Sequence, residues 1–245
     1  MTDANSSVRI AFRIPGDWSH PGELLERIPD GFRLTPEVLV LPDGGEIEFI
    51  PMPPDDEFPQ IFRSSCRRDA TDEELAIVDR YTVNVGLAGP GGSLDSALTM
   101  VQAGAAIVQA GGAGVFIDNS GLAHGGRHWL ELLDDGSPDA LSFAFVSIVS
   151  GEREVWTMGM HVLGFPEIVM RRSDLEADAE TIIEVLRYVC SESRPIGDGH
   201  MFVDENGPRY LVKATTNDEF PAGSPMHNPF GRLMLTSMKD IAEEN

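Results

Sequence analysis

Two histidines four residues apart are the feature of the sequence that most suggests chemistry. His124 and His128 lie in the stretch GLAHGGRHW, residues 121–129. In HExxH metalloprotease helices, two histidines at this spacing bind zinc while the glutamate between them acts as a base. Here Gly-Gly-Arg stands between them, so that base is missing. Because two glycines disfavour a helix, we expect His124 to precede a helix and His128 to lie in its first turn.

A divalent metal could still bind this pair if a third ligand approached it. Asp118 and His161 are the candidates, because both are expected on strands nearby. Such a site would make the chain a metal-dependent hydrolase. The alternative is that no cofactor binds, that His124 contacts backbone groups and that His128 is a surface residue.

A second distinctive stretch is WTMGMHVLGFPEI, residues 156–168. Gly159 would let another element approach a strand closely, and Glu167 is a lone acid that has no evident partner as a general base. Together with Asn119 and Trp129, these residues predict a small-molecule pocket between 119–129 and 157–167. The alternative is that the stretch only packs in the core.

Two other motifs lack what their chemistry requires. The loop AGPGGS, residues 88–93, lies between a predicted strand and a helix, yet it has no lysine and matches no phosphate-loop pattern. Ser120 in DNSG lacks the GxSxG pattern of a nucleophile turn. We therefore interpret both as turns.

The elements that must position these residues follow from periodicity, turn residues and capping signals. Residues 51–70 are Pro-rich and acidic and read as a linker. Capping boxes are expected at Thr71 with Glu74 and at Ser173 with Glu176. The predicted strands are 8–14, 38–41, 46–50, 82–87, 114–118, 141–149, 154–163, 200–203 and 209–214, and the predicted helices are 22–28, 71–80, 93–110, 126–133 and 173–190.

Hairpins mixed with helices favour an α+β fold with mainly antiparallel sheets and helices on one face. Strand-helix-strand-strand units are expected at 8–51 and 114–163. We divide the chain into an N-terminal unit with linker, 1–70, and a main α+β domain, 71–245. One continuous domain over 1–245 is the alternative.

The net charge of the chain restricts the classes of partner that it can bind. Forty acidic residues against 18 basic ones give a net charge of −22. Nucleic-acid phosphates and anionic membrane surfaces repel such a chain, whereas a basic protein partner is attracted. The sequence has no signal-peptide pattern and no apolar run suited to a membrane span. We therefore expect a cytoplasmic protein.

Short motifs between residues 82 and 190 resemble a bacterial family known as domain of unknown function family 4261. A strand with a Gly-aromatic start leads to a polar turn and a short helix, and a Thr-x-Gly segment ends in Gly-x-Pro-Glu. The matching residues are Gly114, Phe116, Asn119, His124, Thr157, Gly159, Gly164, Pro166 and Glu167. The resemblance implies an intracellular bacterial α+β protein, and it supplies no catalytic residues.

Because no catalytic constellation is complete, the sequence favours a non-catalytic protein that binds a partner, most simply another protein. A metal-dependent hydrolase around His124 and His128 is the first alternative, and a small-molecule-binding domain is the second. The candidate ligand-binding residues are Asp118, Asn119, His124, His128, Trp129, His161 and Glu167, and the candidate metal ligands are His124, His128 and His161.

Overall fold

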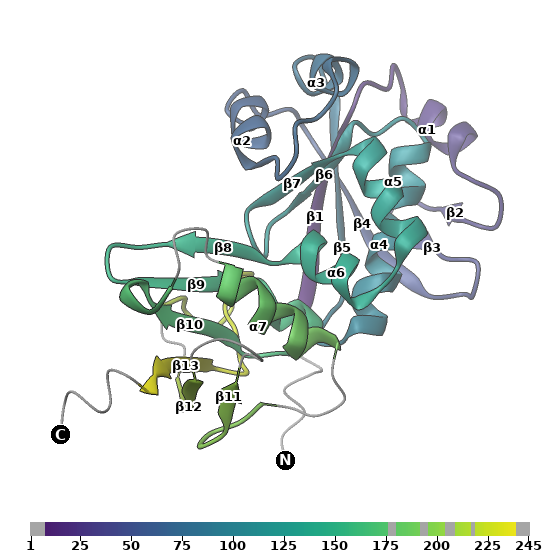
Figure 1. Ribbon diagram of the computed structural model, residues 1–245. Helices are drawn as coiled ribbons and strands as arrows, with labels where there is room; N and C mark the ends of the chain where they lie inside the picture. Colours follow the sequence, from purple (N-terminus) through teal and green to yellow (C-terminus); the bar gives the residue numbers. More distant parts are fainter. Residues whose placement is uncertain (1–7, 176–179, 192–195, 204–208, 217–218, 239–245) are drawn as a thin grey trace.

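The computed structural model describes residues 8–175, 180–191, 196–203, 209–216 and 219–238 (Figure 1). Within these residues the strands form one sheet of seven and one of six. All paired strands are antiparallel except β10 and β13. The predicted α+β class with mainly antiparallel sheets is confirmed.

The seven-stranded sheet has the order β2-β3-β4-β5-β1-β6-β7. Its strands are β1 (Arg9–Gly16), β2 (Arg33–Leu34), β3 (Val38–Val40), β4 (Glu46–Met52), β5 (Val83–Pro90), β6 (Gly114–Ile117) and β7 (Leu122–Gly125). β1 lies between β5 and β6, so the N-terminal strands pair directly with strands that follow residue 80. Described residues of 1–70 and of 71–125 therefore share one sheet.

The six-stranded sheet has the order β11-β12-β13-β10-β9-β8. Its strands are β8 (Ser147–Ser150), β9 (Glu154–Met158), β10 (Glu167–Arg171), β11 (Met201–Val203), β12 (Arg209–Thr215) and β13 (Arg232–Ser237). The predicted hairpin near the C-terminus is confirmed by the pairing of β11 with β12.

The described helices are α1 (Pro21–Arg27), α2 (Phe58–Ser65), α3 (Asp72–Val78), α4 (Leu94–Gln109), α5 (Gly126–Asp135), α6 (Pro138–Phe145) and α7 (Glu180–Ser191), with 3-10 helices at Met160–Leu163 and Arg172–Asp174. The predicted caps of two helices are confirmed. Thr71 and Glu74 form a capping box at the start of α3, and Ser93 caps α4. None of the helices in the described residues is long and apolar enough to cross a bilayer.

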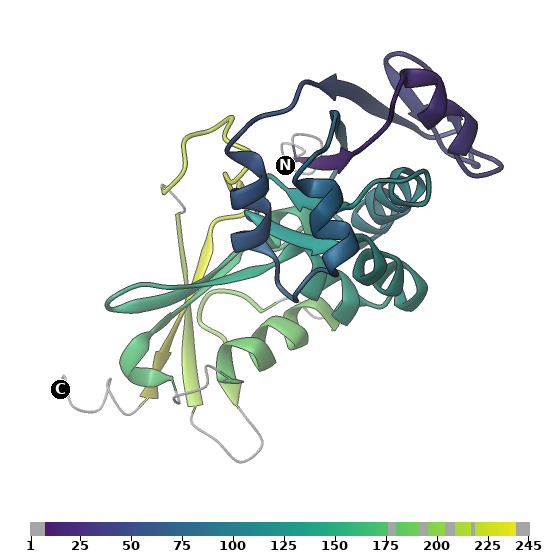
Figure 2. The same ribbon diagram turned by 90° about the horizontal axis from the view of Figure 1, so that it is seen from above.

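Helices cover both faces of the seven-stranded sheet, not one face as expected. On β6, Val115 and Ile117 belong to the main core, whereas Phe116 joins a second cluster with Phe58 of α2 and Val78 of α3. Neighbouring residues on a strand point to opposite faces. Both faces of β6 are apolar, so each needs its own cover. Figure 1 shows α2 and α3 on one side of these strands and α4 and α5 on the other, and Figure 2 shows the same helices from above.

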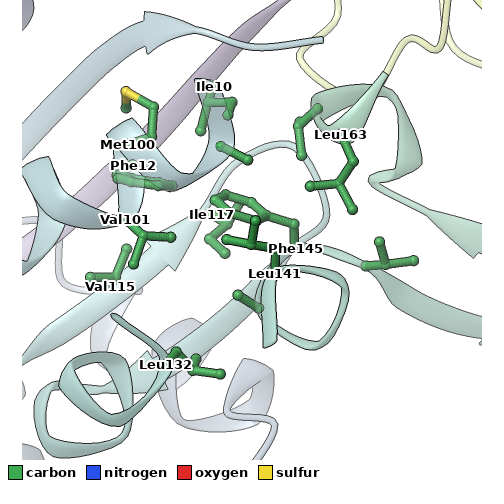
Figure 3. Packing of buried hydrophobic residues seen from close by; sticks show 14 of the residues in the cluster. Ile10, Phe12, Met100, Val101, Val115, Ile117, Leu132, Leu141, Phe145 and Leu163 are labelled. Atoms are coloured by element: carbon green, nitrogen blue, oxygen red, sulfur yellow. The ribbon is translucent and has the colours of Figure 1, made fainter. Parts of the chain in front are cut away.

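The main core is continuous between the two sheets. It joins Ile10 and Phe12 of β1 and Met100 of α4 to Phe145 of α6 and Leu235 of β13. Figure 3 shows several of these side chains, with Ile117, Phe145 and Leu141 close together near the centre of the view. The two sheets therefore share one hydrophobic core among the described residues.

The expected strand at 141–149 is wrong, because its first half is helix α6. Ser137 accepts a hydrogen bond from the Ala140 backbone N–H, and Pro138 occupies the first helical turn, where its missing N–H costs nothing. In the run ALSFAF five of the six residues are apolar and all but the half-buried Phe143 are buried, and such a run does not reveal its period.

The expected strand at 154–163 is too long. It ends at Met158, and Gly159 has a φ of 109°, a left-handed conformation that starts the 3-10 helix. The expected linker at 51–70 contains helix α2. Ser173 lies in a 3-10 turn, while its capping partner Glu176 falls outside the described residues.

Candidate functional site

The candidate side chains from the sequence separate into two clusters and two single positions. One cluster contains Asn119, His161 and Glu167, and the other contains His124 and His128. Asp118 forms an ion pair with Arg13, 2.9 Å between Oδ1 and Nε, and burial raises the pKa of Asp118. Trp129 is fully buried in the main core, where its indole N–H donates to the Val101 carbonyl.

Glu167 sits at the centre of the first cluster, with its side chain buried. Its Oε2 accepts a hydrogen bond from Thr157 Oγ1 at 2.8 Å. Its Oε1 accepts from the Gly159 backbone N–H at 3.2 Å and from Asn228 Nδ2 at 2.9 Å. A buried carboxylate is tolerated when donors surround it. Thr157, Gly159 and Asn228 of this chain supply the donors that Glu167 needs.

The Pro225 carbonyl completes the same cluster from a distant part of the chain. It accepts from Asn119 Nδ2 at 2.8 Å and lies 2.9 Å from His161 Nε2. A carbonyl oxygen only accepts, so Nε2 of His161 carries a proton. The other ring nitrogen, Nδ1, faces Glu167 Oε1 at 3.6 Å. His161 borders a cavity of about 500 Å³. Its Nε2 is hydrogen-bonded to the Pro225 carbonyl, while the buried Nδ1 makes no hydrogen bond within the described residues.

Local backbone geometry explains why glycines flank His161. A Cβ atom on Gly159 would lie 2.2 Å from the Phe145 carbonyl oxygen, and one on Gly164 would lie 2.5 Å from that of Gly92. Both residues have positive φ angles, which side chains other than glycine rarely adopt. The Thr-x-Gly and Gly-x-Pro-Glu motifs of the sequence therefore build this cluster.

His124 anchors the second cluster from a fully buried position on β7. Its Nε2 lies 2.9 Å from the Ala144 carbonyl oxygen, so this nitrogen carries the proton. Burial lowers the pKa of His124 to about 3, which keeps the ring neutral near pH 7. Its Nδ1 is then a hydrogen-bond acceptor.

That acceptor orients His128, which lies in the first turn of α5 as expected. The two Nδ1 atoms are 3.4 Å apart, so His128 Nδ1 must donate the proton between them. In the neutral ring, His128 Nε2 is left as an acceptor. Burial, and next the nearby Arg68 charge, lower the pKa of His128. The buried histidine thus fixes the tautomer of the half-exposed one.

His128 borders a groove of about 660 Å³. Three helices, the strand β8 and the segment after α2 form its walls. Its charged and aromatic lining residues are Arg67, Arg68, His128, Glu131, Asp135, Asp139, Phe143 and Arg187. The groove has a size typical of ligand pockets.

Two arginines are held against one aromatic ring in this groove. The guanidinium carbons of Arg67 and Arg68 lie 4.5 and 5.1 Å from the centre of the Phe143 ring. Arg67 also donates to the Phe143 and Val146 carbonyls. Burial lowers the pKa of Arg67, although an arginine stays protonated in proteins. Stacking fixes these cations in place.

The groove arginines lack carboxylate partners. Within the described part of the chain, neither Arg67, Arg68 nor Arg187 forms an ion pair. Elsewhere Arg9 pairs with Glu48 and Arg80 with Asp17, and further pairs involve Arg13, Arg27, Arg63, Arg127 and Arg232. Sequence reasoning missed this groove, because Arg67, Arg68 and Arg187 are far apart along the chain or unremarkable in it.

The described residues contain no group of three or more His, Cys, Asp or Glu placed to hold a metal ion. Neither of the expected third ligands joins the histidine pair: Asp118 faces Arg13 and His161 faces Pro225 and Glu167. Among the described residues, the geometry therefore places an oriented His128 beside Arg67 and Arg68, and it does not bring three metal ligands together.

Comparison of the chain with family models, curated proteins and solved structures finds no match. The resemblance to domain of unknown function family 4261 stays a prediction. Four of its residues, Asn119, Thr157, Gly159 and Glu167, do meet in the first cluster.

Proposed function

We propose that the chain is a non-catalytic binding protein whose groove holds the carboxylate or phosphate groups of a ligand. The observation that carries this proposal is the set of groove arginines without ion pairs, in a chain with 40 acidic residues. The cytoplasmic setting expected from the sequence is part of the proposal.

The groove chemistry supports an anion in three ways. A guanidinium group presents a planar fork of N–H donors that matches carboxylate and phosphate oxygens. Arg67 and Arg68 are already held by Phe143, so little side-chain freedom remains to be lost on binding. His128 is neutral before binding and adds a cation when it takes up a proton.

The overall charge of the chain acts against this attraction. The net charge of −22 repels anions, but salt screens that repulsion beyond about 10 Å at moderate ionic strength, so binding depends on contacts inside the groove. A basic partner protein, expected from the overall charge, would bind a different face. The two kinds of partner do not exclude each other.

Calorimetric titration with citrate and with inorganic phosphate tests the proposal. Arg68→Gln should weaken binding about tenfold, because it removes a charge-assisted contact. Arg33→Gln is the matched control, since Arg33 is exposed on β2 and outside the groove. Unfolding curves of both variants should match the parent.

Two results would overturn the proposal. One is the absence of measurable binding of either anion to the parent protein. The other is an equal loss of affinity in Arg68→Gln and Arg33→Gln, which would point to general charge and not to the groove.

A further inference from the structure

The strand β8 is the outermost strand of the six-stranded sheet (Figure 1). Among the described residues it pairs only with β9. Ser147, Ile148 and Val149 are half-buried and Ser150 is exposed. An outermost strand carries backbone donors and acceptors that another strand can use.

The pairing register shows which backbone groups face outward. Gly151 N–H donates to the Glu154 carbonyl at 2.9 Å, so these opposite residues form a hydrogen-bonded pair. Such pairs alternate with non-hydrogen-bonded pairs in an antiparallel ladder. Val149 with Trp156 is then hydrogen-bonded, while Ile148 with Thr157 and Ser150 with Val155 are not. The N–H and C=O groups of Ile148 and Ser150 point away from β9.

This outer edge borders the groove that holds the arginines. The Ile148 side chain lines the groove together with Arg67, Arg68 and Arg187. Arg67 also contacts the residue that precedes β8, since its Nη1 donates to the Val146 carbonyl at 2.8 Å. Main-chain hydrogen-bonding groups and unpaired cations therefore lie side by side.

We propose that the ligand of the groove is an extended acidic peptide segment of a partner protein, which adds to β8 as a further strand. This rests on the proposed function, because the arginines supply the charge recognition. Strand addition supplies main-chain hydrogen bonds, and alternate side chains of the added strand face one side of the sheet. Glutamate or aspartate at alternate positions would then reach the groove arginines.

Charge complementarity selects this occupant over others. The groove lining also holds Glu131, Asp135 and Asp139, but Glu131 pairs with Arg127 and Asp135 accepts from the Ser137 backbone N–H, whereas the groove arginines have no carboxylate partner among the described residues. A basic peptide would leave these arginines unpaired, and a nucleic acid would meet the net charge of −22 without gaining strand pairing. A small anion would use the arginines and leave the outward groups of Ile148 and Ser150 unused. The peptide uses both features.

The test uses a fluorescently labelled peptide of four Glu-Val repeats and its Lys-Val counterpart, measured by fluorescence polarisation against the intact chain. Two further Glu-Val peptides carry backbone N-methyl groups on either the Glu or the Val residues. N-methylation removes the N–H donors on one edge of an extended strand and leaves its charge unchanged. We expect one methylated peptide to bind at least tenfold more weakly and the other to bind like the parent. Any binding of the Lys-Val peptide should be unaffected by Arg68→Gln, because a basic segment would bind a different face of the chain.

Variants of the protein supply the second arm. Ser150→Pro removes an outward N–H on an edge strand, where proline is tolerated, and Ser150→Ala is its matched control. The peptide should bind about fivefold more weakly to Ser150→Pro, while Ser150→Ala binds it normally. Citrate affinity should be unchanged in both variants. Arg68→Gln should weaken binding of both peptide and citrate.

The outcomes separate the two proposals. If neither methylated peptide, or both equally, lose affinity, strand addition is overturned while anion binding stands. Lys-Val peptide binding that depends on Arg68 overturns the acidic partner. If Arg68→Gln weakens neither citrate binding nor peptide binding, the proposed function itself is overturned. Concentration-dependent dimerisation that excludes the peptide would assign the edge to a second copy of the chain and overturn the partner peptide.

Discussion

The two histidine clusters differ in which groups surround their polar atoms. Around Glu167 and His161, hydroxyl, amide and carbonyl groups of the chain face the carboxylate and the ring. Around His124 and His128, the buried ring is satisfied by the Ala144 carbonyl, but the outer ring and the neighbouring arginines open into a groove. One cluster is closed and the other is open.

The difference teaches that burial of polar groups alone does not mark a functional site. A buried carboxylate whose donors come from two separate segments, 157–160 and Asn228, mainly fixes one folded arrangement. Cations without carboxylate partners, in a chain rich in carboxylates, are better evidence of binding. The closed cluster should therefore respond to mutation through stability, and the open one through affinity.

The largest effect is expected for Glu167→Ala. It leaves the donors of Thr157, Gly159 and Asn228 buried without an acceptor. Such a loss costs about 3–5 kcal/mol of the free energy of unfolding, measured by urea denaturation. His128→Gln should cost less than about 1 kcal/mol, because His128 is half-exposed and makes one long contact. Equal costs would show that the two clusters do not differ as described.

The sequence predicted more of the fold than of the site. Caps at Thr71 and Ser93 were predictable because capping depends on neighbouring residues. The helix α6 was not, because apolar residues occupy almost every position of its run, so the run shows no period. Asn119, His161 and Glu167 were recognised as distinctive, yet their partners Pro225 and Asn228 are brought in by tertiary structure. The groove arginines give no local signal, since their lack of partners exists only in three dimensions.

The second prediction concerns acid stability. The pKa of His124 is about 3 in the folded state and ordinarily 6.5, so the unfolded chain binds a proton in this window and the folded chain does not. Stability therefore falls as pH drops below 6.5, by about 3 kcal/mol between pH 7 and 4 from this group. His124→Gln, which keeps a donor for the Ala144 carbonyl, should show a shallower fall in urea denaturation. An unchanged slope would mean that His124 is not buried as a neutral ring.

A third prediction isolates the backbone geometry of the closed cluster. Gly159→Ala should lower the free energy of unfolding by about 3 kcal/mol, because it adds a clash with the Phe145 carbonyl to the strain of a positive φ. Gly44→Ala is the matched control, with a φ of 89° and no atom within 4 Å of the added Cβ. It should cost about 1 kcal/mol. Equal losses in thermal unfolding would remove the clash from the explanation.

The smallest effect is a pH dependence of anion affinity in the open cluster. Burial and the Arg68 charge lower the pKa of His128 in the free protein, and a bound anion favours the protonated ring and raises that pKa again. The affinity for the anion should therefore increase as pH falls and His128 takes up a proton. The increase is up to about tenfold, since each pKa unit gained on binding corresponds to tenfold in affinity. Sulfate is the suitable probe in calorimetric titration, because its own charge stays constant between pH 8 and 5. His128→Gln should bind sulfate with a flat pH profile, while His20→Gln, outside the groove, should keep the parent profile. If His128→Gln kept the pH dependence of the parent protein, the titrating group would lie elsewhere, and His128 would have no part in anion binding.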